Sequence, residues 1–354
     1  MEQSHFEQAP EVLPDQERLP LTPIQAAFLE RLATLRDSSV GPLPDFTEYL
    51  THYGRIPSHD PTSGTLAGMC LSRVDLQPFA EAGEVTPNSF TFDAQPTLEL
   101  GRENSWRKVF FGQMHMESRS GTIDKSVQVA VKRFPKDEIH YAVQEAAMLQ
   151  YLQQQGVPAL EVIGLLMHEE AEEPGVYLLT RFTQEVISLD NPDWSKLSPK
   201  EMQDQLRAVR NTLVTLHQGL VFHGDAEFKN IGVGERDGSI VVFDVERAVS
   251  LRDAVSQEEG AEGEVPIRLI QEMSADFSSV QKSLRKYVYP NLPEDHRPKN
   301  DKERFEYELN HILEPYHMAL MESDSPYKSA LDRAYRTVLE RKHREVMGEP
   351  IMQR

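Results

Sequence analysis

Residues 223–230 read His-Gly-Asp-Ala-Glu-Phe-Lys-Asn, and residues 240–246 read Ile-Val-Val-Phe-Asp-Val-Glu. The first segment places a carboxylate, Asp225, ahead of an amide, Asn230, and the second ends an apolar, β-branched run on Asp244. An Asp-Gly pair lies between the two segments, at Asp237 and Gly238. This pattern predicts a β-hairpin that brings Asp244 back beside Asn230. Because carboxylate and amide oxygens are hard ligands, we expect these two residues to hold a magnesium ion, while Asp225 orients a hydroxyl group.

A second group of residues upstream fits the same chemistry. Residues 127–134 read Val-Gln-Val-Ala-Val-Lys-Arg-Phe, which predicts a strand that carries Lys132. A lysine is a compact point charge that follows phosphate oxygens. The next segment, 138–153, has apolar residues at a helical period and carries Glu145.

These segments together resemble the protein-kinase-like superfamily. The loop 223–230 matches the pattern H-x-D-x-x-x-x-N, the strand around Lys132 is similar to V-A-I-K, and Asp244 ends the metal-binding strand. Gly224 in place of arginine, and Asp-Val-Glu in place of Asp-Phe-Gly, are more similar to the aminoglycoside phosphotransferase and choline kinase branch, or to the RIO kinases, than to eukaryotic protein kinases.

The resemblance implies an α+β, two-lobed protein-kinase-like fold. We expect an N-terminal appendage over 1–95, a β-rich N-lobe over 96–182 and a mostly helical C-lobe over 183–354. It further implies that Lys132 contacts the phosphates of ATP and pairs with Glu145. Glu138 is an alternative partner, although it falls near the start of the predicted helix.

The resemblance also predicts other site residues, although this sequence departs from the usual kinase pattern in the loop that covers the nucleotide. The nucleotide-covering loop keeps a single glycine, Gly101, so Asn104 and Ser105 are expected to supply side-chain contacts instead. Lys229 is a candidate cation for the transferring phosphoryl group, and a solvated surface lysine is the alternative. His223 is expected to shape the loop by hydrogen bonding.

Further elements follow from capping and periodicity. Ser198, Pro199 and Glu201 predict the start of a helix that leads into the loop 223–230. A helix over 268–284 carries Asp276, which resembles the aspartate that braces this loop in the superfamily. The remaining predicted elements are strands over 160–167 and 176–182, with a nucleotide-binding hinge at 181–184, and helices over 22–36, 302–321 and 327–347.

Composition narrows the function. The chain has 354 residues and a formal net charge of −20, which argues against nucleic acid as a partner and favours a cationic acceptor. No run approaches the roughly 20 apolar residues of a membrane span, so no membrane partner is expected. A single cysteine, Cys70, fits a reducing cytoplasm. Nothing in the sequence indicates the oligomeric state.

The sequence therefore predicts a phosphotransferase that depends on ATP and Mg²⁺. It would move the γ-phosphoryl group to a hydroxyl of a small molecule, or less readily of a protein. The alternative is a pseudokinase that serves as a nucleotide-binding or protein-interaction module, which the glycine-poor loop around Gly101 favours. Retention of Lys132, Asp225, Asn230 and Asp244 favours catalysis, because a scaffold has no chemical need for all four.

Overall fold

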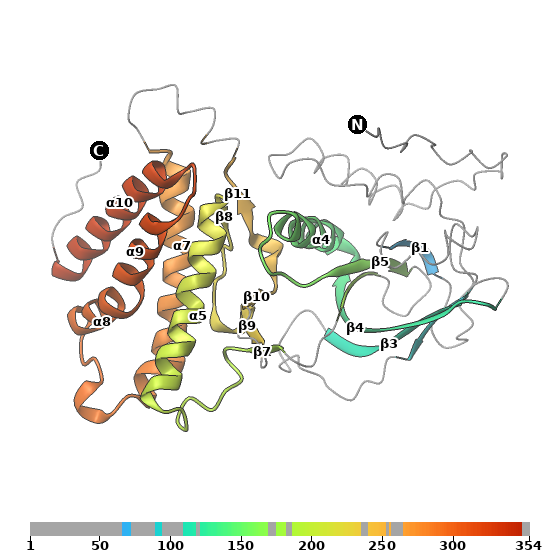
Figure 1. The fold of residues 1–354 in the computed structure, drawn as a ribbon, viewed down its shortest axis with the longest axis horizontal. Coiled ribbons are helices and arrows are strands. Elements are labelled where there is room, and N and C mark those ends of the chain that lie inside the picture. Colours follow the sequence, from blue (N-terminus) through green and yellow to red (C-terminus); the bar gives the residue numbers. More distant parts are fainter. Residues whose placement is uncertain are drawn as a thin grey trace, which may run out of the picture.

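A β-rich region precedes a helical region along the chain, so the fold is α+β (Figure 1). The computed structural model describes residues 66–71, 89–93, 109–117, 121–168, 175–181, 186–234, 240–252, 255 and 265–348. The predicted helix over 22–36 lies outside these residues.

The β-rich region is built on a six-stranded antiparallel sheet with the strand order β1-β5-β6-β4-β3-β2. Its strands are β1 (Leu66–Leu71), β2 (Ser89–Asp93), β3 (Val109–Glu117), β4 (Asp124–Pro135), β5 (Val162–His168) and β6 (Gly175–Arg181). Strands β4, β5 and β6 confirm the predicted runs. By contrast, β1 and β2 come from the segment 1–95 that we expected to form an appendage, so the sheet extends into that segment. Both are short strands at the edges of the sheet, and their sequences contain too few residues to predict a strand from periodicity.

Among the described residues, helix α4 (Ile139–Gln154) packs on this sheet and contributes to its core. Helix α4 follows a short 3₁₀ turn, η1 (Lys136–Glu138), and packs against β5 and β6. Its buried side chains recur at the spacing of one helical face, and they include Ala142, Ala146 and Leu149. The predicted helix over 138–153 is confirmed to within one residue.

The helical region contains α5 (Pro199–Gln218), α7 (Ile267–Ser283), α8 (Asp301–Glu308), α9 (Glu314–Glu322) and α10 (Lys328–Met347). A capping box starts α5, since the Ser198 hydroxyl accepts from the Glu201 amide and the Glu201 carboxylate accepts from the Ser198 amide. Helices α5 and α7 lie nearer to the β-rich region, and helices α8 to α10 lie on the side of α5 and α7 that faces away from it (Figure 1). These helices share one hydrophobic core.

A π-helical turn interrupts one predicted helix and a second π-helical turn follows another, and the sequence indicated neither turn. The helix over 302–321 is divided into α8 and α9 by the π turn η7 (Leu309–Leu313). Helix α7 continues directly into the π turn η4 (Leu284–Val288). Such turns often lie at functional sites.

The predicted hairpin joins the two sequence segments that we singled out first. Strands β9 (Ile231–Gly234) and β10 (Ile240–Val242) are antiparallel, and Ile231 pairs with Val242. Strand β7 (Val186–Ser188) adds to the other side of β9. A further pair, β8 (Val221–Phe222) and β11 (Val249–Ser250), flanks the loop 223–230 and the segment after Asp244. The hairpin therefore brings the residues next to Asn230 and Asp244 to the same end.

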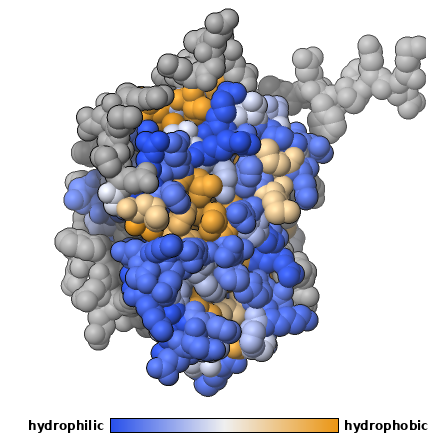
Figure 2. Space-filling view, turned by 90° about the vertical axis from the view of Figure 1, so that its left-hand side faces the viewer, coloured by the Kyte–Doolittle hydropathy of each residue, from blue (hydrophilic) through white to orange (hydrophobic). Residues whose placement is uncertain are grey.

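The outer face of the helical region is mainly hydrophilic with scattered apolar side chains (Figure 2). Two of the large exposed apolar residues, Met318 and Met347, lie on α9 and α10. Within the described part of the chain, no helix combines the length and apolar character that crossing a bilayer requires.

Candidate active site

The ammonium group of Lys132 joins two distant parts of the chain. Its Nζ lies 2.7 Å from Glu145 Oε2 on α4 and 2.5 Å from Asp244 Oδ1, which follows β10. The ion pair that we expected between Lys132 and Glu145 is therefore present, whereas the alternative partner Glu138 lies in the turn η1 before the helix. These contacts place the β-rich region directly against the β9–β10 hairpin.

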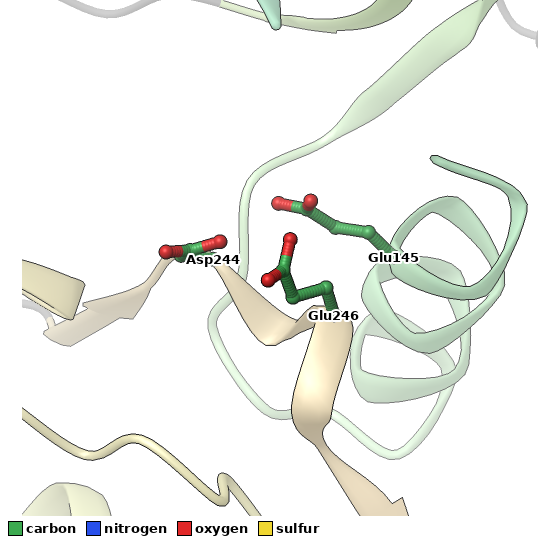
Figure 3. Close-up of side chains that lie close together, drawn as sticks. All are labelled: Glu145, Asp244 and Glu246. Carbon is green, nitrogen blue, oxygen red and sulfur yellow. The ribbon is translucent and has the colours of Figure 1, made fainter. Parts of the chain in front are cut away.

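Glu246 is a third carboxylate in this cluster, and we did not expect it from the sequence. Its Oε2 lies 3.5 Å from Lys132 Nζ. Oxygen atoms of Glu145, Asp244 and Glu246 lie within 4.8 Å of one another. In Figure 3, Glu145 reaches in from α4, and the other two come from the segment after β10. In the sequence, only the position of Glu246 two residues after Asp244 indicated that its carboxylate could join the cluster.

The electrostatics of the cluster favour a cation. Burial lowers the pKa of the Lys132 ammonium, but the charges and hydrogen bonds of Glu145 and Asp244 outweigh burial, and the pKa is raised. Lys132 therefore remains protonated at neutral pH. Three carboxylates around one ammonium leave an excess of negative charge, and hard oxygen donors in such a group suit a divalent ion.

Asp244 has an unusual backbone conformation. Its φ of 51° and ψ of 50° lie in the left-handed region, which costs a non-glycine residue on the order of 1–3 kcal/mol. Aspartate is one of the few residues that adopt this region routinely. The conformation turns the chain from β10 into the 3₁₀ turn η3 (Val245–Arg247), which carries Glu246 back to the cluster.

Asp225 and Asn230 contact each other within the loop 223–230. The Asn230 side-chain amide donates to the Asp225 carbonyl at 2.8 Å and to Asp225 Oδ2 at 3.2 Å. The backbone amide of Phe243 donates to the Asn230 carbonyl at 2.9 Å. Asn230 is thus tied both to Asp225 and to the residue that precedes Asp244, as the hairpin predicted.

Charged side chains alternate in sign beside Asp225. Lys229 Nζ lies 3.3 Å from Asp225 Oδ2 and 3.6 Å from Glu227 Oε2, and Lys282 of α7 pairs with Glu227 Oε1. Burial raises the pKa of Glu227, but Lys282 and Lys229 outweigh burial, and the pKa is lowered. The side chain of Lys229 is exposed but contacts Asp225, and its role as a cation for the transferring phosphoryl group stays a prediction.

A buried aspartate holds the start of the loop, as we expected. Asp276 of α7 is fully buried and accepts hydrogen bonds from the backbone amides of His223 at 2.9 Å and Gly224 at 2.7 Å. His217 Nε2 donates to the same carboxylate at 3.0 Å. The ring of His223 donates from Nε2 to the Phe243 carbonyl at 2.9 Å. His223 therefore shapes the loop by hydrogen bonding.

Gly224 lies at a position where any side chain would be strained. Its φ is +74°, and a Cβ atom would lie 2.7 Å from the Arg247 carbonyl oxygen. We expect Gly224→Ala to lower the free energy of unfolding by more than the roughly 1–2 kcal/mol that a left-handed conformation costs. The additional loss of stability comes from the clash of the new Cβ atom with Arg247. To relieve this clash, the loop 223–230 must move away from the segment that carries Glu246. Urea unfolding measures the loss of stability.

Gly156→Ala is the matched control for this prediction. Gly156 has a similar φ of +72°, but a Cβ atom there would meet nothing within 4 Å. It reports the cost of the backbone conformation alone. If both variants lose the same free energy of unfolding, the close approach of Arg247 to Gly224 does not contribute to the loss.

Several predicted residues fall outside the described part of the chain. These are the nucleotide-loop residues Gly101, Asn104 and Ser105, and hinge residues 182–184. Among the residues that the structure does describe, Glu246, Lys282 and Ser283 were missed. No local pattern marks Lys282 or Ser283, because their place beside the loop 223–230 depends on how α7 packs.

Comparison with known proteins agrees with this geometry. Residues 104–259 match the model of the lipopolysaccharide kinase (Kdo/WaaP) family, a span of less than half of the chain that includes Lys132, Glu145, Asp225 and Asp244. No curated protein matches the sequence. The family match indicates a kinase-like phosphotransferase. The segment 104–259 thus belongs to the protein-kinase-like superfamily, in which this family is placed.

Proposed function

We propose that the protein is an ATP- and magnesium-dependent phosphotransferase that moves the γ-phosphoryl group of ATP to a hydroxyl of a small molecule. The observation that carries this proposal is the convergence of Lys132, Glu145 and Asp244 from a strand, a helix and a hairpin. A scaffold protein would gain little from such a cluster, since buried charges cost free energy unless each is compensated.

In this proposal, Lys132 binds phosphate oxygens of the nucleotide and Glu145 orients its side chain. Glu145 is buried, and its short contact with Lys132 limits where the ammonium group can lie. The nucleotide-loop residues Gly101, Asn104 and Ser105 would cover the phosphates. The two regions of the fold would form the small and large lobes of a kinase, with the nucleotide between them.

The residues also fit a magnesium ion. Asp244 and Asn230 are the proposed ligands, and Glu246 supplies a further carboxylate at the same place. The match is one of donor chemistry, because hard oxygen ligands and an excess of negative charge are what magnesium requires. When bound, the ion would neutralise charge on the phosphate groups.

Asp225 would act on the acceptor. Its carboxylate is partly exposed, and the Asn230 amide and Lys229 hold it in place. Asp225 would orient the hydroxyl and accept its proton, while the acceptor oxygen forms a bond to the γ-phosphorus and the bond from that phosphorus to the bridging oxygen of ADP breaks. Lys229 would stabilise charge on the group in transfer.

The family description favours a sugar hydroxyl as the acceptor, because the matching family is described as lipopolysaccharide kinases. The cationic acceptor that the net charge suggested stays a prediction. A cytoplasmic location, which the single cysteine suggested, is likewise part of the proposal.

Nucleotide binding and phosphate transfer test this function together. We expect ATP with magnesium, at about 100 times its dissociation constant, to stabilise the wild-type protein by about 2.7 kcal/mol in thermal unfolding. Asp244→Asn should lose the magnesium-dependent part of this gain, and Lys132→Met should lose most of the gain from ATP. Transfer from γ-labelled ATP is then screened across sugars, amino sugars and amino alcohols.

Asp204→Asn serves as the control for both variants. Asp204 is an exposed carboxylate on α5 in a pair with Arg207, far in sequence from the cluster. It should respond to the nucleotide as the wild type does. A wild-type protein that gains no stability from ATP with magnesium, and labels no acceptor in the screen, contradicts the proposed function.

A further inference from the structure

Helix α7 holds the loop 223–230 near both of its ends. Asp276 binds the backbone amides of His223 and Gly224, and the Ser283 hydroxyl accepts from the Phe228 amide at 3.0 Å. Asp276 and Ser283 lie one heptad apart and so share one face of the helix. The Asp276 and Ser283 side chains are both buried. The spacing along α7 thereby sets the span of the loop.

Ser283 replaces a missing cap. The loop ends in a 3₁₀ turn, η2 (Phe228–Asn230), whose N-cap residue, Glu227, makes no side-chain capping hydrogen bond. Amides at the start of a helical turn have no acceptor within the turn, and a buried amide without one is costly. The hydroxyl of Ser283 provides this acceptor from another helix, so α7 fixes the first residue of the turn.

The side chain of Phe228 is held as firmly as its amide. Its ring is fully buried and stacks with Trp194, at 5.3 Å between ring centroids, and with Tyr287, at 5.9 Å. Tyr287 belongs to the π turn η4, which begins directly after Ser283. The departure from α-helical geometry thus lies at the place where α7 meets the loop, as π turns often do at functional sites.

The turn that Ser283 caps carries two of the proposed site residues, Lys229 and Asn230. We propose that Ser283 is a positioning residue that sets the place of Asn230 toward the metal, an inference that rests on the proposed function. Asn230 Nδ2 donates to Asp225, and its carbonyl accepts from Phe243, so a rotation of the turn would move the amide group relative to both partners.

Metal binding tests this inference without any measurement of catalysis. The probe is Mn²⁺ with ADP, and the free Mn²⁺ is counted by electron paramagnetic resonance. We expect Ser283→Ala to weaken Mn²⁺ binding about tenfold, because the loss of a group that orients a ligand typically costs 10- to 100-fold in metal affinity. The affinity for ADP without metal should stay within about twofold of wild type.

Ser283→Cys keeps the side chain close to its original size but offers only a weak acceptor, so it should weaken Mn²⁺ binding by a smaller factor. It also preserves the test if the alanine variant fails to fold. Thr212→Val is the matched control. Thr212 is equally buried, and its hydroxyl donates to the Ala208 carbonyl within α5. It should lose comparable thermal stability and leave Mn²⁺ affinity within about twofold.

The outcomes separate the two proposals. Tenfold weaker Mn²⁺ binding in Ser283→Ala, with an unchanged Thr212→Val variant, supports a positioning role. If Ser283→Ala and Thr212→Val bind Mn²⁺ equally well, Ser283 only stabilises the fold, and the inference is wrong while the proposed function stands. A wild-type protein that binds no Mn²⁺ with ADP overturns the proposed function and this inference with it.

Discussion

Asp225→Asn is expected to lower the rate of phosphate transfer by about 10²- to 10⁴-fold, the range that a positioned general base contributes. Asparagine has nearly the same shape, and its side-chain oxygen can still accept from the Asn230 amide, which now donates to Asp225 Oδ2 at 3.2 Å. What it lacks is a basic oxygen for the acceptor proton and the charge that attracts Lys229. The measurement is the initial rate of transfer from γ-labelled ATP to the best acceptor of the screen.

A binding measurement on the same variant identifies the cause of the loss. Asp225 is not among the proposed metal ligands, so stabilisation of Asp225→Asn by ATP with magnesium should equal that of wild type within about 0.5 kcal/mol. Asp204→Asn should retain full activity, because its carboxylate lies on the exposed side of α5. Should Asp225→Asn keep more than about a tenth of the wild-type rate, Asp225 is not the group that accepts the proton.

Lys342→Met is expected to produce the largest loss of stability, about 3–5 kcal/mol at neutral pH. Lys342 on α10 lies 2.7 Å from Glu308 Oε2 on α8, and the two side chains are 16% and 3% exposed. Removing one partner of a buried pair leaves an uncompensated charge in the interior. Tyr289 donates its hydroxyl to Glu308 Oε1 at 3.2 Å, which does not replace a cation. Urea unfolding followed by circular dichroism measures the change.

The double variant Lys342→Met with Glu308→Gln distinguishes a stranded charge from lost packing. Glutamine keeps an oxygen for the Tyr289 hydroxyl but carries no charge, so the double variant should recover much of the stability lost in Lys342→Met. Arg344→Met breaks the more exposed pair with Glu340 on the same helix and should cost no more than about 0.5–1 kcal/mol. If the double variant is as unstable as Lys342→Met alone, the loss of stability comes from lost packing of the lysine side chain and not from an uncompensated charge.

Local patterns were sufficient to predict most of the secondary structure. The β-branched run around Lys132 is β4, and the capping residues at Ser198 start α5. The two strands expected on either side of the Asp-Gly pair are antiparallel neighbours. Helix α4 lies where the apolar periodicity placed it, and α7 and α10 lie to within one residue of the ranges predicted for them. These features depend on residues a few positions apart, so the sequence contains them directly. The edge strands β1 and β2 and the two π turns do not show this local pattern.

The sequence by itself determined which side chains are available for the proposed chemistry: Lys132 as the ammonium group, Asp225 as the acid proposed for the acceptor, and Asn230 and Asp244 as the oxygen donors proposed for a cation. Only the tertiary structure decided which other side chains join them. Glu246 enters the cluster because Asp244 adopts a left-handed conformation, and Ser283 reaches the Phe228 amide because α7 packs beneath the loop. Contacts of this kind depend on where helices and strands meet in the folded core, and packing between distant segments leaves no periodic trace in the chain.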